Sequence, residues 1–401
     1  MKKNPLNPKR KSISYGHQWI DETDIEEVAK VLRSDFITTG PVALEFENDL
    51  CELTGAKHAI ACSNGTTALH LACLALDIEE NSLGVTSPIT FLASANCVEF
   101  CNGRVDFIDI DRNTLCLSPD RLEEYCDNIA VPELVIPVDF AGVPADLSGI
   151  RTLSNKYGFK IIEDAAHSIG STYTHNGKTY HCGGCAHTDL AIFSFHPVKT
   201  ITTGEGGAVL TNNDEMADKI RRMRSHGIMR DSNLLGRNDG PWYYEMSDLN
   251  FNYRITDFQC ALGKSQLRKL SQFKRRRKDI VDRYNAAFKG NPALITPEEP
   301  EGSSVCYHLY PLQFEGGNKI RYKVFTRLSA LNIFCQIHYI PVYWQPYYHK
   351  KYDFQTEKCP EAETYYARCL SLPLYPALKD DEVDFIISNI LECLESVEDR
   401  E

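Results

Sequence analysis

The chain has 401 residues and a formal net charge of −12 at neutral pH. A chain of this length can bury the cores of one large domain and a smaller one. The negative charge disfavours non-specific binding of nucleic acid. No apolar run reaches the roughly 18 residues that a membrane-spanning helix needs, and the basic N-terminal stretch lacks the apolar centre of a secretory signal. We therefore expect a cytoplasmic protein with a flexible tail over residues 1–13.

In the first half of the chain, the hydrophobic period alternates between extended and helical patterns. This alternation favours an α/β fold with a mostly parallel sheet wrapped by helices. The ligand of such a sheet binds at the carboxyl ends of the strands. Helices are expected over residues 20–34, 42–54, 67–76 and 147–157, and strands over 59–62, 83–86, 105–110, 134–140, 159–163 and 190–195.

The segment 63–67, Ser-Asn-Gly-Thr-Thr, lies between an expected strand and an expected helix. Its free N–H groups and hydroxyls, together with the positive end of the helix dipole, would form an anion site. Ordinary capping of a structural helix by Ser or Asn is the alternative. No Gly-Lys-Ser/Thr follows, so the segment is not a Walker loop.

Asp164 follows an expected strand and precedes small residues. A buried carboxylate at a strand end can keep a pyridine nitrogen protonated, as an aldehyde cofactor such as pyridoxal phosphate requires to accept electrons. The neighbouring Glu163 would point to the opposite face of the strand. The alternative for Asp164 is the N-cap of a following helix.

Lys199 lies between the apolar run 190–195 and the glycine-rich segment 204–207. A lysine just past a strand end, beside backbone that a ligand can approach closely, suits a Schiff base to a carbonyl cofactor. A solvated surface lysine is the alternative. Together with Asp164 and the anion site, Lys199 favours the cofactor hypothesis.

The fifteen cysteines are expected to be free thiols, many of them buried. The one Cys-x-x-Cys pattern, Cys182 to Cys185, has His181 and His187 nearby. A zinc site needs four ligands, and no second cysteine pair follows at a suitable spacing. We therefore expect no metal and interpret this segment as a glycine-containing loop between strands.

From about Asp257 the sequence changes character. A long charged helix is expected over 259–288, and its basic run 274–278 is expected to be a solvated face. A proline-containing link follows, and later patterns predict a small α+β domain. The expected strands are 307–314 and 334–339, and the expected helices are 320–331, 361–370 and 380–394. We therefore predict a large cofactor-binding domain over 14–256 and a small C-terminal domain over 257–401.

The order of these motifs resembles the DegT-type nucleotide-sugar aminotransferases. The anion turn is followed by Asp164, then Ser194-x-x-x-x-Lys199, then Asn252-Tyr253-Arg254. The resemblance extends from about residue 14 to residue 391 and includes Pro-Ile-Thr-Phe at 88–91. It implies a fold-type I pyridoxal 5'-phosphate enzyme with a large, mostly parallel sheet and a smaller α+β C-terminal domain.

The resemblance also implies roles for individual residues. Lys199 and Asp164 would be catalytic, and Phe91 would stack on the cofactor ring. His167 would lie near the ring hydroxyl, with a structural histidine as the alternative. The cofactor phosphate would be bound by Gly65, Thr66, Ser194 and Asn252. The last of these would come from the neighbouring subunit, which implies a homodimer with shared active sites.

Within the family, the sequence is most similar to the subgroup of pseudaminic acid biosynthesis. The implied substrate is UDP-4-keto-6-deoxy-N-acetyl-β-L-altrosamine, with glutamate as the amino donor. The implied substrate contacts are Tyr15, Asp35, Phe36, Ile37, Thr38, Gly65, Ser194, Asn252, Gln336, Ile337, His338 and Tyr339. Many wider relatives have histidine where this chain has Asp139, so a contact of Asp139 with the ring is in doubt.

Three other functions are compatible with parts of this pattern. Another nucleotide-linked keto-sugar could be the substrate of the same reaction. Dehydratases on the same scaffold replace the lysine with histidine, so Lys199 argues against that activity. A non-catalytic pyridoxal-phosphate binding protein is disfavoured because both Lys199 and Asp164 are present.

Overall fold

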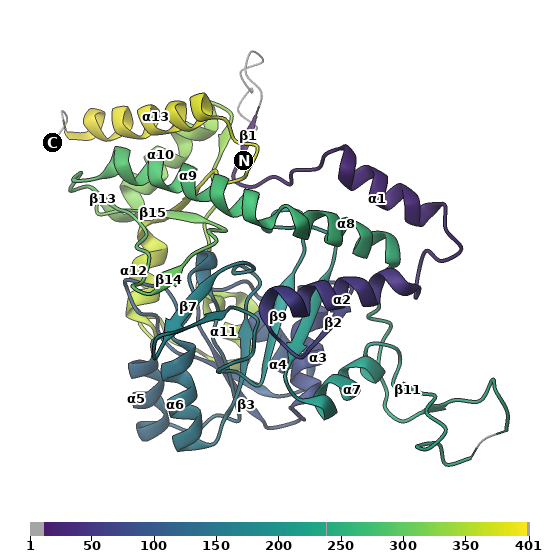
Figure 1. The fold of residues 1–401 in the computed structure, drawn as a ribbon. Helices are drawn as coiled ribbons and strands as arrows, with labels where there is room; N and C mark the ends of the chain where they lie inside the picture. The colour runs from purple at the N-terminus through teal and green to yellow at the C-terminus, as the bar shows by residue number, and fades with distance from the viewer. Residues whose placement is uncertain (1–11, 238, 399–401) are drawn as a thin grey trace.

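The computed structural model describes residues 12–237 and 239–398, and its centre is a seven-stranded sheet (Figure 1). The strand order is β2 (His58–Cys62), β10 (Gly207–Thr211), β9 (Leu190–Ser194), β6 (Lys160–Asp164), β5 (Leu134–Ile136), β3 (Leu83–Thr86) and β4 (Arg104–Phe107). All neighbouring pairs are parallel except those of β10, which runs antiparallel to both β2 and β9. The predicted mostly parallel sheet is confirmed, although the sequence interpretation missed β10.

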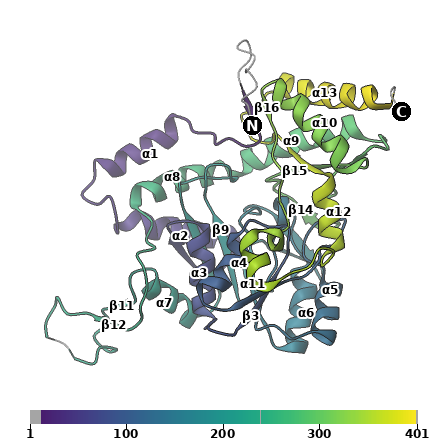
Figure 2. The ribbon, with the colours of Figure 1, turned by 180° about the vertical axis from the view of Figure 1, so that it is seen from behind.

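Helices cover both faces of this sheet, because successive strand residues point to opposite sides. On one face, Ile162 and Ile192 pack against α3 (Gly65–Ala75), α4 (Ala93–Phe100) and α7 (Asp214–Met223). On the other face, Ile161 packs with α5 (Pro119–Asn128) and α6 (Leu147–Tyr157), while Ala191 packs with α2 (Pro41–Thr54). Figure 2 shows α3 and α4 from behind. Asp164 therefore faces the α3–α4 side, and Glu163 faces the side of α5 and α6.

The predicted helix 259–288 is divided into α8 (Asp257–Arg268) and α9 (Leu270–Phe288). The side chain of Lys269, at the junction, binds Asp21 and Asp24 beside α1 (Glu22–Leu32). α8 lies against α1 and α2, whereas α9 packs against α13 (Asp380–Glu398). These two consecutive helices therefore cross from the large sheet to the C-terminal part of the molecule.

The C-terminal part contains a three-stranded antiparallel sheet in the order β13 (Leu294–Ile295), β15 (Tyr310–Phe314), β17 (Cys369–Leu372). It packs with α10 (Gly317–Ala330), α12 (Pro360–Arg368) and α13. One hydrophobic cluster joins Phe107 and Phe140 to Tyr310 and Leu328. The two parts therefore share a core, and a domain boundary at residue 257 stays a prediction.

Two sequence expectations are corrected in this part. The predicted strand 334–339 is only β16 (Ile333–Phe334), because the residues after it line the cavity described below. β1 (Ile13–Ser14) pairs with β16 and Ile13 is buried, so the predicted flexible tail over 1–13 does not include Ile13. Residues 1–11 of that tail lie outside the described residues.

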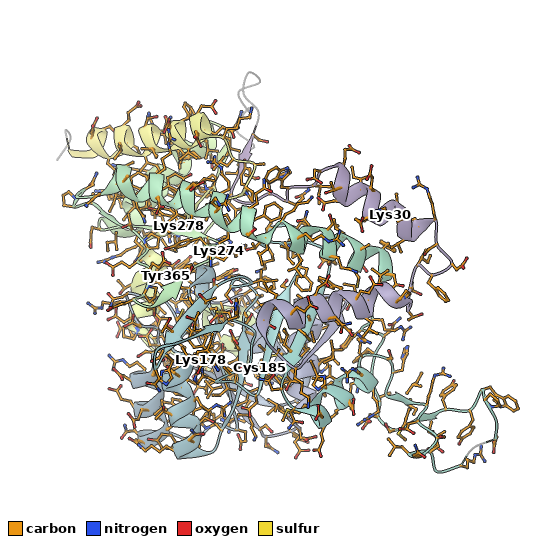
Figure 3. All side chains as sticks on the ribbon, in the orientation of Figure 1. Lys30, Lys178, Cys185, Lys274, Lys278 and Tyr365 are labelled. Carbon is orange, nitrogen blue, oxygen red and sulfur yellow. The ribbon has the colours of Figure 1, made fainter. Side chains whose placement is uncertain are left out.

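The basic run 274–278 was expected to be a solvated face, which is wrong for Arg277. This side chain is only 1 % exposed, and its guanidinium donates hydrogen bonds to the carbonyl oxygens of Tyr307, His308 and Leu374. Lys274 and Lys278 lie along the same helix (Figure 3). The backbone carbonyls replace the carboxylate partner that a buried arginine usually has.

Two smaller features complete the fold. The Cys182–Cys185 segment is a loop between β8 (Lys178–His181) and β9, as the sequence predicts. The described residues between β11 (Ile228–Met229) and β12 (Glu245–Met246) form an arm that projects from the body at the lower right of Figure 1. None of the described helices is long and apolar enough to cross a bilayer.

Candidate active site

A cavity of about 820 Å³ opens at the carboxyl ends of β6 and β9 and at the amino end of α3. This is the edge of the sheet at which the sequence predicts the ligand. One wall comes from the large sheet and its helices, and the other from the C-terminal segment 336–340. The predicted residues that line the cavity are Tyr15, Gly65, Thr66, Phe91, Asp164, His167, Ser194, Lys199, Gln336, Ile337, His338 and Tyr339.

Lys199 lies in the turn after β9, where its backbone N–H donates to the carbonyl of His196. The side chain is partly accessible from the cavity but is surrounded by protein. This burial lowers the pKa of the Lys199 amine to about 8, and the charge of Asp164 opposes the shift. A useful fraction of the amine is therefore unprotonated near neutral pH, as a nucleophilic lysine requires.

Asp164 ends β6 and faces the same cavity. Its Oδ2 accepts a hydrogen bond from the Ser94 hydroxyl at 2.6 Å, and its Oδ1 accepts one from the Ala166 N–H at 3.2 Å. Burial raises the pKa of Asp164, whereas Ser94, Ala166 and the charge of Lys199 lower it. The three opposing contacts favour the carboxylate form, which a protonated ring nitrogen would need as its partner.

The anion turn has the geometry that the sequence predicts. Asn64 caps α3, with its Oδ1 accepting from the Thr67 N–H at 2.9 Å, so the N–H groups of Gly65 and Thr66 lie at the positive end of the helix. A Cβ atom on Gly65 would come within 2.9 Å of the Ser194 Cβ. Glycine therefore lets the helix end and Ser194 converge on one anion.

His167 lies at the back of the cavity as a neutral imidazole. Its Nδ1 accepts from the Ala141 N–H at 3.3 Å, which places the ring proton on Nε2, 3.5 Å from the Tyr339 hydroxyl. Burial, with the charges of Lys199 and His338, lowers the pKa of His167 well below its usual value. His167 thus offers a fixed N–H donor near the cavity.

The C-terminal wall is held by contacts behind it. His338 Nδ1 is 2.8 Å from the Ser371 hydroxyl, and burial lowers the pKa of His338 to about 3. The Tyr15 ring packs 5.1 Å from the His338 ring, and the Tyr15 carbonyl accepts from the Leu374 N–H. An exposed ring, Phe91, lies 6.4 Å from Tyr339 at the cavity. This arrangement forms an aromatic wall opposite Asp164 and Lys199.

Two predicted groups do not line the cavity of this chain. Phe36 and Ile37, from the segment 35–38, are exposed, and Asn252 pairs through its backbone with Ser225. A backbone bridge between Thr38 and residue 256 ties the two groups together. Any contact of Asp35, Phe36, Ile37, Thr38 or Asn252 with a ligand therefore requires a second copy of the chain or a rearrangement.

The sequence interpretation missed Ser94, which lines the cavity, and His308, which packs behind it. Ser94 lies three residues after Phe91 in the first turn of α4, a spacing that would place both on one side of that turn. His308 packs its ring 4.4 Å from the His167 ring, and its buried Nδ1 has no hydrogen-bond partner among the described residues. No local pattern around His308 distinguishes it from a core histidine.

Asp139 and Glu163 form a buried group with Cys182 on the opposite side of β6. Ligand atoms of these three residues lie within 4.8 Å of one another, and no other such group is found in the described part of the chain. Asp139 accepts from the Ala145 N–H and the Ser168 hydroxyl, and Glu163 accepts from Gly183 N–H. Burial raises the pKa of both carboxyls. Asp139 is therefore a structural residue and does not line the cavity.

Comparison of the sequence with known protein families identifies the family of this chain. The model of the DegT/DnrJ/EryC1/StrS aminotransferase family matches residues 18–391. The chain belongs to this aminotransferase family. Its fold is accordingly that of a fold-type I aminotransferase.

Two relatives and one solved structure illustrate the relationship within the DegT family. The UDP-4-amino-4,6-dideoxy-N-acetyl-beta-L-altrosamine transaminase of Campylobacter jejuni is 36 % identical, with 96 % of this chain and 98 % of the relative covered. The spore coat polysaccharide biosynthesis protein SpsC of Bacillus subtilis is 35 % identical with the same coverage. PseC of Helicobacter pylori, an aminotransferase involved in the biosynthesis of pseudoaminic acid, has a TM-score of 0.86 and 28 % identity, covering 96 % of this chain and 100 % of PseC.

Proposed function

We propose that this chain transfers an amino group from glutamate to a UDP-linked 4-keto-6-deoxy-N-acetylhexosamine, with pyridoxal 5'-phosphate as the cofactor. The specific substrate we propose is UDP-4-keto-6-deoxy-N-acetyl-β-L-altrosamine. The observation that carries the proposal is the convergence of the Lys199 amine, the Asp164 carboxylate and the amino end of α3 on one cavity. The similarity to the Campylobacter jejuni transaminase supports the choice of substrate.

The residues around the cavity suit this cofactor. Gly65, Thr66 and Ser194 would bind its phosphate at the amino end of α3, and Phe91 would cover one face of its ring. Asp164 would hold a proton on the ring nitrogen, and the Nε2–H of His167 would donate toward the ring hydroxyl. When bound, the cofactor supplies an electron sink for the negative charge that develops at the donor Cα.

The proton transfers fall to Lys199. Its amine faces the cavity, where it would remove the proton from the donor Cα and return one in the second half of the reaction. A pKa of about 8 lets Lys199 exchange protons in both directions near neutral pH. The buried histidines around it are neutral and therefore do not compete as proton donors.

A second copy of the chain would complete the site. Among the described residues that line the cavity, Lys199 is the sole lysine or arginine, which leaves a diphosphate without a dedicated cation. The arm between β11 and β12 exposes Leu234 and Trp242, and the segment 35–38 exposes Phe36 and Ile37. We propose a homodimer in which Asn252 and the segment 35–38 serve the partner's cavity.

A second candidate is transamination of another nucleotide-linked keto-sugar. The observation that favours it is the similarity to SpsC of Bacillus subtilis, which is about as high as the similarity to the Campylobacter jejuni transaminase. Both candidates use the same cofactor and the same Lys199 chemistry. They differ only in the sugar that contacts Tyr15 and residues 336–339.

The test is a competition between sugars with purified protein, pyridoxal 5'-phosphate and glutamate. UDP-4-keto-6-deoxy-N-acetyl-β-L-altrosamine and its C5 epimer are supplied separately, and 2-oxoglutarate and the 4-amino product are measured. The proposal predicts that the altrosamine derivative has the higher kcat/KM by tenfold or more, about 1.4 kcal/mol of transition-state discrimination. The proposed substrate would be wrong if the epimer were preferred, or if glutamate were consumed and neither sugar were aminated. Either result would favour the second candidate.

A further inference from the structure

A serine on α4 makes the shortest contact with Asp164. Ser94 is 1 % exposed, and its hydroxyl donates to Asp164 Oδ2 at 2.6 Å across 70 residues of sequence. We propose that Ser94, supported by Thr90, is a positioning residue that keeps Asp164 ionised and oriented toward the cavity. This inference rests on the role proposed for Asp164 but not on the identity of the sugar.

The direction of the hydrogen bonds follows from counting protons. The Ser94 hydroxyl has one proton and three possible acceptors: Asp164 Oδ2 at 2.6 Å, the Thr90 hydroxyl at 2.7 Å and the Phe91 carbonyl at 3.4 Å. A charged acceptor at the shortest distance forms the strongest bond, so the proton points to Asp164. Thr90 then donates to Ser94. Both hydroxyls are buried, so water does not compete for either bond.

The two oxygens of Asp164 are fixed from different elements. Ser94 on α4 holds Oδ2, and Ala166, just after β6, holds Oδ1. Each oxygen accepts one hydrogen bond from these donors and keeps a second lone pair for a partner in the cavity. The titratable groups that interact with Asp164 from other elements are Lys199 and Tyr339. Lys199 attracts the carboxylate by charge alone, so Ser94 is the strongest directional contact.

The same turn would also position the cofactor ring. Ser94 N–H donates to the Phe91 carbonyl at 3.3 Å, which couples the two side chains rigidly. The loop before them is anchored because Val342 N–H donates to the Pro88 carbonyl at 3.1 Å. One short segment therefore positions both Phe91, which would cover the face of the cofactor ring, and Ser94, which contacts Asp164.

The test measures the titration of Asp164 in the apo chain by carbon-13 NMR of labelled aspartate, with the resonance assigned through Asp164→Asn. Removing a hydrogen bond to a charged group costs about 1.5 kcal/mol or more, so Ser94→Ala should raise the pKa of Asp164 by about one unit. Ser94→Thr keeps the hydroxyl and should restore the value. Thr90→Val should give a smaller upward shift.

Thr86→Val is the matched control, because Thr86 is equally buried but donates to the Ile136 carbonyl and not to Asp164. This variant should lose stability like Ser94→Ala and leave the Asp164 titration unchanged. As a second readout, Ser94→Ala should weaken binding of pyridoxamine phosphate about tenfold, while Thr86→Val should not. An Asp164 titration in folded Ser94→Ala that matches the wild type would overturn the inference. Unchanged cofactor affinity in Asp164→Asn would instead overturn the role of Asp164 itself.

Discussion

Glu163 and Asp164 are neighbours at the end of β6, yet their surroundings differ. Asp164 faces α4 and the cavity, where a hydroxyl, an N–H group and the Lys199 amine favour its charge. Glu163 faces the opposite side, where its closest polar neighbours include a second carboxyl, Asp139. Burial raises the pKa of both; two hydrogen bonds and the Lys199 charge oppose the rise at Asp164, whereas the Asp139 charge adds to the rise at Glu163. The ionisation of these two buried carboxyls at the end of β6 therefore depends on the groups beside each one and not on burial alone.

Lys199, which lies on the same side of β6 as Asp164, is predicted to be indispensable for turnover. Lys199→Ala should reduce turnover by more than about 10⁴-fold, because it removes both the nucleophile and the general base. The fold should persist, since the Lys199 side chain forms no hydrogen bond with any residue of the described ranges 12–237 and 239–398, and pyridoxamine phosphate should still bind. Single-turnover assays and equilibrium dialysis measure the two properties. Normal turnover in this variant would remove Lys199 from the mechanism.

Isosteric changes of the two neighbouring acids sharpen the comparison directly. Asp164→Asn should lower kcat by about 10²-fold or more, because an amide cannot stabilise a protonated ring nitrogen. Glu163→Gln should leave kcat within about threefold, since Glu163 lies on the side of β6 away from the cavity. Both variants should melt cooperatively. Equal losses of kcat in the two variants would mean that the two sides of β6 are not functionally distinct.

The pKa of Lys199, about 8, predicts a pH dependence for loading of the apo chain with pyridoxal 5'-phosphate. Only the unprotonated amine reacts, so the second-order rate should rise almost tenfold per pH unit well below pH 8 and level off above it. Stopped-flow absorption across about pH 6 to pH 9 measures the curve. A rate that still rises about tenfold per pH unit at pH 9, as expected for an ordinary lysine with a pKa of about 10.4, would show that the amine is not buried as described.

The smallest predicted effect is a pH dependence of the free energy of unfolding, caused by Glu163. Asp139 accepts two hydrogen bonds from other groups and Glu163 one, so we expect Glu163 to be the carboxyl of this pair that holds a proton. The folded pKa of Glu163 is raised above its usual 4.5, so the folded chain binds a proton that the unfolded chain has lost above that pH. Stability therefore falls as pH rises from about 4.5 toward the folded pKa, by about 1.4 kcal/mol per unit.

Glu163→Gln should remove this slope, because its amide can donate to Asp139 as the protonated carboxyl does. Urea unfolding of the wild-type and variant apo chains across the range from about pH 5 to pH 8 measures the difference. The variant should gain stability relative to the wild type as pH rises. Parallel stability curves would show that Glu163 and Asp139 do not share a proton.

Local patterns in the sequence were sufficient for the features that depend on neighbouring residues. The strand β3 and the helix α6 match their predicted bounds, and the anion turn, Asp164 and Lys199 meet in one cavity. Glycine, caps and strand ends are local signals, and the ends of adjacent strands necessarily lie together.

Features that depend on distant contacts could not be predicted in this way. Ser94 touches Asp164 only because α4 packs against the sheet, and Arg277 is buried only because three distant carbonyls surround it. The segment 336–339 has the composition of a strand but lines the cavity. The antiparallel strand β10 follows the glycine-rich turn directly, and its place between β2 and β9 is a property of the whole sheet.

The most direct test of the account is the absorption spectrum of purified protein with pyridoxal 5'-phosphate, before and after glutamate is added. The account predicts a visible band from cofactor bound to Lys199, which is replaced by the spectrum of pyridoxamine phosphate as 2-oxoglutarate appears. A band that does not respond to glutamate would contradict the proposed donor. No band at all, with a folded protein and excess cofactor, would contradict the central role of Lys199.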